Sequence, residues 1–125
     1  MSVKGVMAVL LGGGIGAALR YIVASYVTRL HSGPFPLGTF LINVTGSFTI
    51  GLLMTFFLYR SDLNPAWRLF LVTGVLGGYT TFSSFEWETL SLVRDSGWWL
   101  GMINVVGSVG LGYCAVWVGS ALARR

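Results

Sequence analysis

The sequence predicts an all-α membrane protein whose single domain, residues 1–125, crosses the bilayer four times. Of the 125 residues, 54% are hydrophobic and only 10% are charged, against about 25% charged in typical soluble domains. The charged residues lie mostly at the ends of uncharged apolar segments long enough to cross a bilayer, which takes about 20 residues. These segments predict spans at approximately residues 3–27, 37–59, 66–92 and 98–123, joined by short connections rich in turn residues.

The net charge of +4 does not indicate a nucleic-acid-binding protein, because Lys and Arg form no basic stripe. Their positions at the ends of the spans are typical of membrane anchors. No metalloprotease motif, nucleotide-binding lysine motif or credible Ser/His/Asp set occurs in the sequence. The single histidine, His31, lies in a predicted loop, and no role is assigned to it. The protein is therefore not expected to be an enzyme.

The first predicted span, residues 3–27, contains Arg20, which lies too deep for an ordinary end anchor. It is interpreted as a vestibule charge that concentrates anions, although pairing with Glu86 or Glu88 explains it equally well. The segment Gly12–Ala17 fits the dinucleotide pattern G-x-G-x-x-A, but no acidic residue follows about 20 positions later and no βαβ unit fits the chain. Helix packing explains these glycines better.

Eighteen glycines in so short a chain predict helices that approach one another closely. Pairs of small residues four positions apart are Gly12/Gly16, Gly74/Gly78 and Ser108/Gly112.

Four spans would place both chain termini on the same side of the membrane. Five basic residues fall on that side and two on the other: Lys4, Arg60, Arg68, Arg124 and Arg125 against Arg29 and Arg94. The bias favours termini inside the cell, but it is modest, so the orientation is left open.

In the second span, residues 37–59, the polar side chains of Thr39 and Asn43 share a helix face at i, i+4 spacing. The Asn43 amide can donate two hydrogen bonds to an anion. A hydrogen bond between helices is the ordinary alternative and explains the residue equally well.

The third span, residues 66–92, has the most polar centre, and Pro65 precedes it at a position typical of a helix start. The glycines, threonines and serines of Leu76–Glu88 favour a break in the helix. Non-helical backbone at this depth is tolerated only where it is buried in protein or lines a cavity. Carbonyls freed by a break can coordinate a hard cation. A kinked helix capped by Ser and Thr is the alternative.

After the break, Phe82 and Phe85 share one helix face, and Thr81, Ser84 and Glu88 form a polar stripe beside it. The edges of aromatic rings carry positive potential and hydroxyl groups donate hydrogen bonds, so this pairing suits a small, strongly hydrated anion. Packing of both rings in a core is the ordinary alternative.

The fourth span, residues 98–123, carries a second polar pair, Asn104 and Ser108, as weaker candidates for lining a pathway. Its Cys114 is the only cysteine, which excludes an intrachain disulfide, and it is predicted to be buried in helix packing. Tryptophans at the span ends are typical of an aromatic belt: Trp67, Trp98 and Trp99.

Three blocks of the sequence resemble the Fluc (CrcB-type) fluoride channel family: Gly16–Tyr21, Gly38–Phe48 and Gly74–Phe85. The third block is the most specific, because it combines the glycines, the Thr-Thr-Phe-Ser run and a second phenylalanine. The resemblance implies a dual-topology antiparallel homodimer with two fluoride pores in the bacterial inner (plasma) membrane. It further implies passive export of fluoride that relieves fluoride toxicity. The charge bias of five to two is less even than dual insertion would favour.

The resemblance also implies roles for individual residues. Pore-lining positions are Phe82, Phe85 and Asn43, with Thr39, Ser84 and Ser108 in the polar track or vestibule. Backbone carbonyls of Gly77 and Thr80 would bind a structural sodium ion on the dimer axis. Arg20 and Glu88 are the vestibule charges.

Two other classes remain as alternatives. A small multidrug-resistance exporter needs a proton-coupled acidic residue in its first span, and residues 3–27 contain none. A non-transporting accessory subunit would need only the glycine surfaces. It would leave mid-membrane Asn43, Ser83 and Ser84 unexplained.

Overall fold

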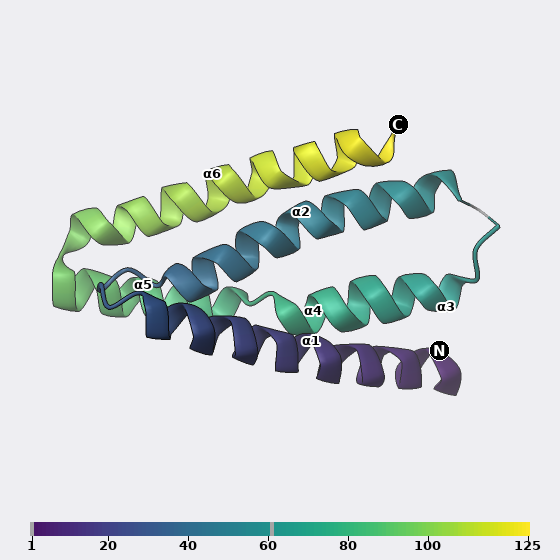
Figure 1. Ribbon diagram of the computed structural model, residues 1–125, viewed down its shortest axis with the longest axis horizontal. Coiled ribbons are helices and arrows are strands. Elements are labelled where there is room, and N and C mark those ends of the chain that lie inside the picture. The colour runs from purple at the N-terminus through teal and green to yellow at the C-terminus, as the bar shows by residue number, and fades with distance from the viewer. Residues whose placement is uncertain (1, 61) are drawn as a thin grey trace.

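The computed structural model describes residues 2–60 and 62–125, and all regular structure in these residues is helical (Figure 1). In chain order the elements are α1 (Val3–Leu30), α2 (Leu37–Tyr59), α3 (Pro65–Arg68), the π-helical η1 (Leu69–Leu76), α4 (Gly77–Tyr79), α5 (Phe82–Ser96) and α6 (Trp98–Ala123). Three of them, α1, α2 and α6, are long and apolar enough to cross a membrane.

Helix ends follow local signals in the sequence. The Ser2 side chain accepts a hydrogen bond from the Gly5 N–H at 3.1 Å and caps α1. Asn64 caps α3 in the same way, and Pro65 occupies the first helical position, as predicted. Gly97 separates α5 from α6 with φ of 96°, a conformation that glycine adopts without strain.

The bounds of α2 and α6 coincide with residues 37–59 and 98–123, whereas α1 continues three residues past position 27, to Leu30. The third expected span is divided between several elements. A continuous helical stretch runs from α3 through η1 to α4, and α5 follows after an interruption. The π-helical geometry of η1 was not expected from the sequence.

The helices form two side-by-side pairs (Figure 1). Helix α1 packs along η1 and α4, α2 packs along α6, and α5 packs against the first part of α6. Both termini lie at the same end of the molecule. Few large apolar side chains are buried, and many are exposed on the outer faces, which suits a protein surrounded by lipid.

Glycines bring the paired helices into backbone contact. A Cβ atom on Gly16 would collide with the backbone of Val75 and Tyr79, and one on Gly12 with the Phe70 carbonyl. The pairs Gly12/Gly16 and Gly74/Gly78 therefore form a seam between α1 and η1–α4, as the spacing predicted. We call this contact the glycine seam.

Two expectations about packing were wrong in detail. The tight contact between α2 and α6 is made by Gly51 and Gly119, whereas a Cβ on Gly112 would meet only Ser47 Oγ at an ordinary 3.5 Å. Cys114 is exposed rather than buried, because it lies on a face of α6 that no other helix of the subunit covers. Trp67, Trp98 and Trp99 are exposed near helix ends, as an aromatic belt requires.

Candidate functional site

The helix interruption lies at Thr80 and Thr81. Both residues have extended backbone, with ψ of 159° at Thr80 and φ of −153° at Thr81. The break was predicted from the glycines, threonines and serines of Leu76–Glu88 together, and of these Gly77 and Gly78 remain helical. Gly78 serves close packing instead, since a Cβ there would strike the Gly13 carbonyl and the Ala17 backbone nitrogen of α1.

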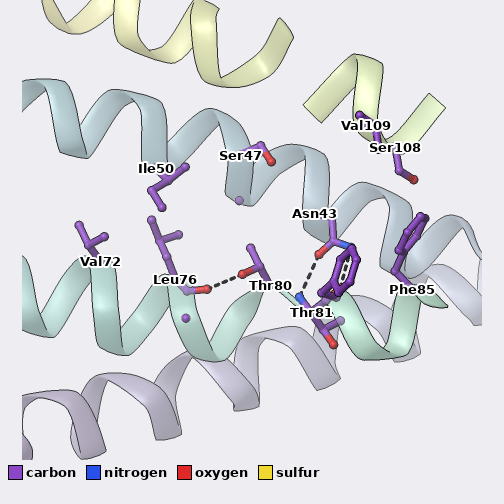
Figure 2. A pocket seen from close by; sticks show the side chains of 13 residues that line it. Asn43, Ser47, Ile50, Val72, Leu76, Thr80, Thr81, Phe85, Ser108 and Val109 are labelled. Carbon is purple, nitrogen blue, oxygen red and sulfur yellow. Dashed lines mark hydrogen bonds between the residues drawn. The ribbon is translucent and has the colours of Figure 1, made fainter. Parts of the chain in front are cut away.

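A side chain from α2 stabilises the extended backbone. Asn43 Nδ2 donates to the Thr81 carbonyl at 2.9 Å, and the Thr81 N–H donates to Asn43 Oδ1 at 2.9 Å (Figure 2). The amide thus satisfies both backbone groups of one non-helical residue, which would otherwise carry the cost of unpaired buried polar groups. We call this pair of bonds the Asn43 clamp. The second N–H of Asn43 is not used by the clamp.

The break also changes the partners of two backbone carbonyls. In a continuous helix, the Gly77 carbonyl would accept from the Thr81 N–H, but this N–H donates to Asn43. Likewise, the Thr80 carbonyl would accept from the Ser84 N–H, which bonds to Thr81 Oγ1 at 3.3 Å. Gly77 and Thr80 are therefore the two positions whose carbonyls lose their usual helical donors to side-chain oxygens.

Thr81 begins α5 as its N-cap residue. Its hydroxyl oxygen accepts from the Ser84 N–H and its proton is donated to Ser84 Oγ at 3.0 Å. Thr81 and Ser84 therefore lie together, as their spacing predicted, and the Ser84 hydroxyl retains its own proton for another acceptor.

A pocket of about 360 Å³ opens beside the break, between α2, the interrupted helix and α6 (Figure 2). It brings together residues that are distant in sequence, and all of its lining residues are uncharged. The predicted site residues among them are Asn43, Gly77, Thr80, Phe82, Phe85 and Ser108.

The two phenylalanines differ in their environment. Their ring centroids are 5.9 Å apart, with the planes tilted by 37°. Phe85 is only 9% exposed, whereas Phe82 is 71% exposed, and both line the pocket. The sequence predicted that they share a face but not that only one of them is packed within the subunit.

Thr39 and Glu88 line a second pocket of about 230 Å³ under the α1–α2 connection. The Thr39 hydroxyl donates to Glu88 Oε1 at 2.9 Å, so its only proton is engaged there. Glu88 Oε2 and His31 Nε2, which line the same pocket, are buried without a hydrogen-bond partner among the described residues. Of the two alternative partners for Arg20, Glu86 and Glu88, Glu88 makes no hydrogen bond to it among the described residues, since Oε1 accepts from Thr39 and Oε2 has no partner.

Some predicted residues lie outside both pockets, and one polar lining residue of the first pocket was missed. Arg20 is half-buried on α1, and neither it nor Ser84 lines either pocket. Ser47 lines the first pocket and was not predicted. Its position four residues after Asn43 on α2 is the signal that would have identified it.

The sequence matches the family model described as "CrcB-like protein, Camphor Resistance (CrcB)" over residues 7–120. Three similar proteins are each named fluoride-specific ion channel FluC. The one from Solibacter usitatus is 56% identical over 92% of this chain and 94% of its own length. That of Rhizobium meliloti is 44% identical over 90% of both chains. That of Clostridium perfringens is 38% identical over 91% of this chain and 89% of its own.

Proposed function

This chain belongs to the CrcB-like family, and from that premise we propose that it is a fluoride-specific ion channel that exports cytoplasmic fluoride passively and so relieves fluoride toxicity. The similar proteins are named as ion channels, in agreement with the prediction that the chain is not an enzyme. With its membrane-capable helices α1, α2 and α6, it is a multi-pass membrane protein. We assign it to the bacterial inner membrane as a single domain, residues 1–125.

The observation that carries the proposal is the uncharged pocket beside the Asn43 clamp. It combines a tilted phenylalanine pair with an amide N–H that the clamp leaves unused and the hydroxyl of Ser108. Fluoride is small and strongly hydrated, so it needs hydrogen-bond donors when it leaves water, and ring edges add positive potential. Carboxylates, which would repel the anion, are absent from this lining.

Residues outside this pocket are assigned to the approaches of the pathway. Thr39 and Ser84 extend the polar track, and Glu88 lies beside Thr39 in the second pocket. Arg20, half-buried on α1, would raise the local concentration of anions in a vestibule.

A homodimer is supported by the incomplete enclosure of the pocket. A pathway for an anion must be shielded from lipid, yet the Phe82 ring is 71% exposed on the subunit surface and Gly77 is exposed beside it. A second copy packed over this side would cover both. We propose that the copies are antiparallel, with subunits inserted in both orientations and one pore on each side of the two-fold axis.

The freed carbonyls of Gly77 and Thr80 are the groups that would hold a sodium ion. Their usual helical donors are bonded to Asn43 and Thr81, which leaves oxygen atoms of the kind that hard monovalent cations prefer. On a two-fold axis, the same carbonyls of both subunits would contribute to one site. The ion would stabilise the dimer and add positive charge near the anion pathway.

The proposed sodium site, and its contribution to the stability of the proposed dimer, are tested by exchanging the cation. Replacing sodium with N-methylglucamine at equal ionic strength should lower the thermal stability of the purified dimer, because this organic cation is too large for a carbonyl site. Choline, another large cation, serves as the matched control and should act like N-methylglucamine. Equal stability in sodium and in both organic cations would contradict the sodium site.

The function itself is tested in liposomes that contain only this protein. Fluoride efflux is read with a fluoride electrode and compared with chloride efflux. Rapid loss of fluoride with chloride retained is the expected result. Transport that requires a proton gradient and a cationic substrate would favour the exporter class, and folded protein with no flux would favour the accessory subunit.

A further inference from the structure

A chain of three part-buried hydrogen bonds connects α6 to the backbone of α5 beside the pocket. Asn104 Nδ2 donates to Thr89 Oγ1 at 2.8 Å, and the Thr89 hydroxyl donates to the Phe85 carbonyl at 2.7 Å. Ser108 Oγ donates to Asn104 Oδ1 at 3.4 Å. Asn104 is 1% exposed, which makes it one of the most deeply buried side chains in the described residues.

The two ends of this chain lie in the pocket, and its middle does not. Phe85 and Ser108 both line the pocket, whereas Asn104 and Thr89 lie outside the lining. The ring and the hydroxyl that we assign to anion recognition are therefore connected to each other from behind, through two side chains that do not reach the pathway.

Hydrogen-bond polarity orients each group in the chain. Because Thr89 Oγ1 accepts from the Asn104 amide, its proton points to the Phe85 carbonyl. The amide nitrogen of Asn104 faces Thr89, so its oxygen faces Ser108 and takes the Ser108 proton. This last bond is longer than the usual O–H···O distance of about 2.5–3.0 Å, so it is the weakest of the three, and the Ser108 hydroxyl is the group that turns most readily toward an anion in the pocket.

Phe85 and Phe82 also differ in their relation to these hydrogen bonds. The Phe85 carbonyl is linked to α6 through Thr89 and Asn104, and Phe85 is 9% exposed, whereas Phe82 is 71% exposed. A ring that recognises an anion by its edge needs a definite orientation, because the face of the ring carries the opposite potential. The anchored ring meets this requirement within one subunit.

We propose that Asn104 and Thr89 are positioning residues for anion selectivity, which hold the Phe85 ring and the Ser108 hydroxyl in register without touching the anion. This inference rests on the proposed function of the pocket. Asn104 and Thr89 would act on selectivity through Phe85 and Ser108. In this they would differ from polar residues whose hydrogen bonds only hold two helices together.

Thr89→Val tests the proposal, since valine keeps the shape of threonine and removes its hydroxyl. The measurement uses liposomes that carry at most one channel each. The fraction of liposomes that leak fluoride counts active channels, and the leak rate reports the rate of each channel. We expect the rate per channel to fall about tenfold, as for an unpaired buried group, with a lower fluoride-to-chloride ratio.

Two further variants separate positioning from stability. Thr89→Ser keeps the hydroxyl and should restore the rate per channel and the selectivity to within about twofold of the native protein. Thr55→Val is the matched control, because the buried Thr55 likewise donates a hydrogen bond of 2.7 Å, to Ser120 between α2 and α6, outside the pocket. It should reduce only the fraction of active channels.

The outcomes distinguish this inference from the proposed function. If the native protein leaks no fluoride, the function fails. If it leaks fluoride selectively and Thr89→Val changes only the number of active channels, as Thr55→Val does, the positioning role is overturned. If Thr89→Val does not fold, Thr89→Ala removes the same hydroxyl with a smaller side chain. A lower rate per channel would then support the positioning role, and a change only in the number of active channels would overturn it.

Discussion

The glycine seam and the Asn43 clamp hold two halves of one interrupted helix by opposite means. In the seam, η1 and α4 lie against α1 through backbone contact at Gly12, Gly16, Gly74 and Gly78, without polar side chains. In the clamp, a single amide from α2 holds the extended backbone of Thr81 by two hydrogen bonds. One contact depends on the absence of side-chain atoms and the other on a particular side chain.

The difference shows what makes the break. Glycines of the third span are used for close approach, and they remain helical. The helix is interrupted where Asn43 takes over both backbone groups of Thr81. Breaking the clamp should therefore impair conduction most, whereas breaking the seam should mainly reduce the amount of folded protein.

The largest effect on conduction is expected for Asn43→Ala. The change leaves the N–H and the carbonyl of Thr81 unpaired, at about 1–3 kcal/mol for each group. Fluoride efflux from liposomes should fall about 100-fold, or about 2.7 kcal/mol, which is in the lower part of the about 2–6 kcal/mol expected for the two groups together. Thr45→Ala is the control, because that hydroxyl bonds within α2 and to the Tyr79 hydroxyl. Efflux near the native rate in Asn43→Ala would show that the clamp is dispensable.

Gly16→Ala should have the next largest effect, on stability. Its Cβ would collide with the backbone of Val75 and Tyr79, and overpacking of this kind costs about 1–3 kcal/mol. Thermal unfolding of the detergent-solubilised protein should begin at a lower temperature. Gly14→Ala is the matched control on the same helix, because nothing lies within 4 Å of a Cβ there. Equal stability of the two variants would refute the seam.

Replacing either ring of the pocket should reduce fluoride passage while leaving the proposed dimer intact. For Phe82→Ile and for Phe85→Ile we expect about tenfold slower efflux, since contacts to an aromatic ring contribute about 0.5–1.5 kcal/mol. Efflux is measured beside the molecular mass of the solubilised protein. Native efflux in both variants would remove the rings from the recognition mechanism and leave the clamp alone beside the pathway.

The smallest effect is expected for Arg20→Gln, which tests whether this cation on α1 attracts anions to the pathway. Removing this cation should slow fluoride efflux by about twofold to threefold at low ionic strength and have little effect at high salt, where charges are screened. Arg20→Lys keeps the charge and should behave like the native protein. An effect that persists in high salt would indicate a structural role.

Local signals in the sequence were sufficient for most of the helices. The ranges 37–59 and 98–123 match α2 and α6, because apolar length and turn residues mark these ends without reference to the rest of the chain. The pairs Gly12/Gly16 and Gly74/Gly78 predicted the seam, because the four-residue spacing of small residues is also a local pattern. Cys114 was wrongly placed in packing, since the sequence of a membrane helix that is apolar all round does not reveal which face is covered.

The structure brings several of the predicted site residues together, but with contacts that the sequence did not predict. Asn43, Phe82, Phe85 and Ser108 do line one pocket. Thr39, placed on the same helix face as Asn43, lines another pocket and gives its proton to Glu88. Equal spacing along a helix predicts a shared face, but the partner of each polar group depends on the helix that packs opposite.

The sequence by itself determined the helical membrane fold, the family and the residue types that can recognise a small anion, because hydrophobic length, turn residues and motifs are properties of neighbouring positions. Only the tertiary structure decided where the third helix is interrupted and which side-chain hydroxyls already donate their proton within the protein. Thr81 lies 38 residues from Asn43 and Asn104 lies 15 from Thr89. Hydrogen bonds over such separations form only after the helices have packed, so no local pattern could specify them.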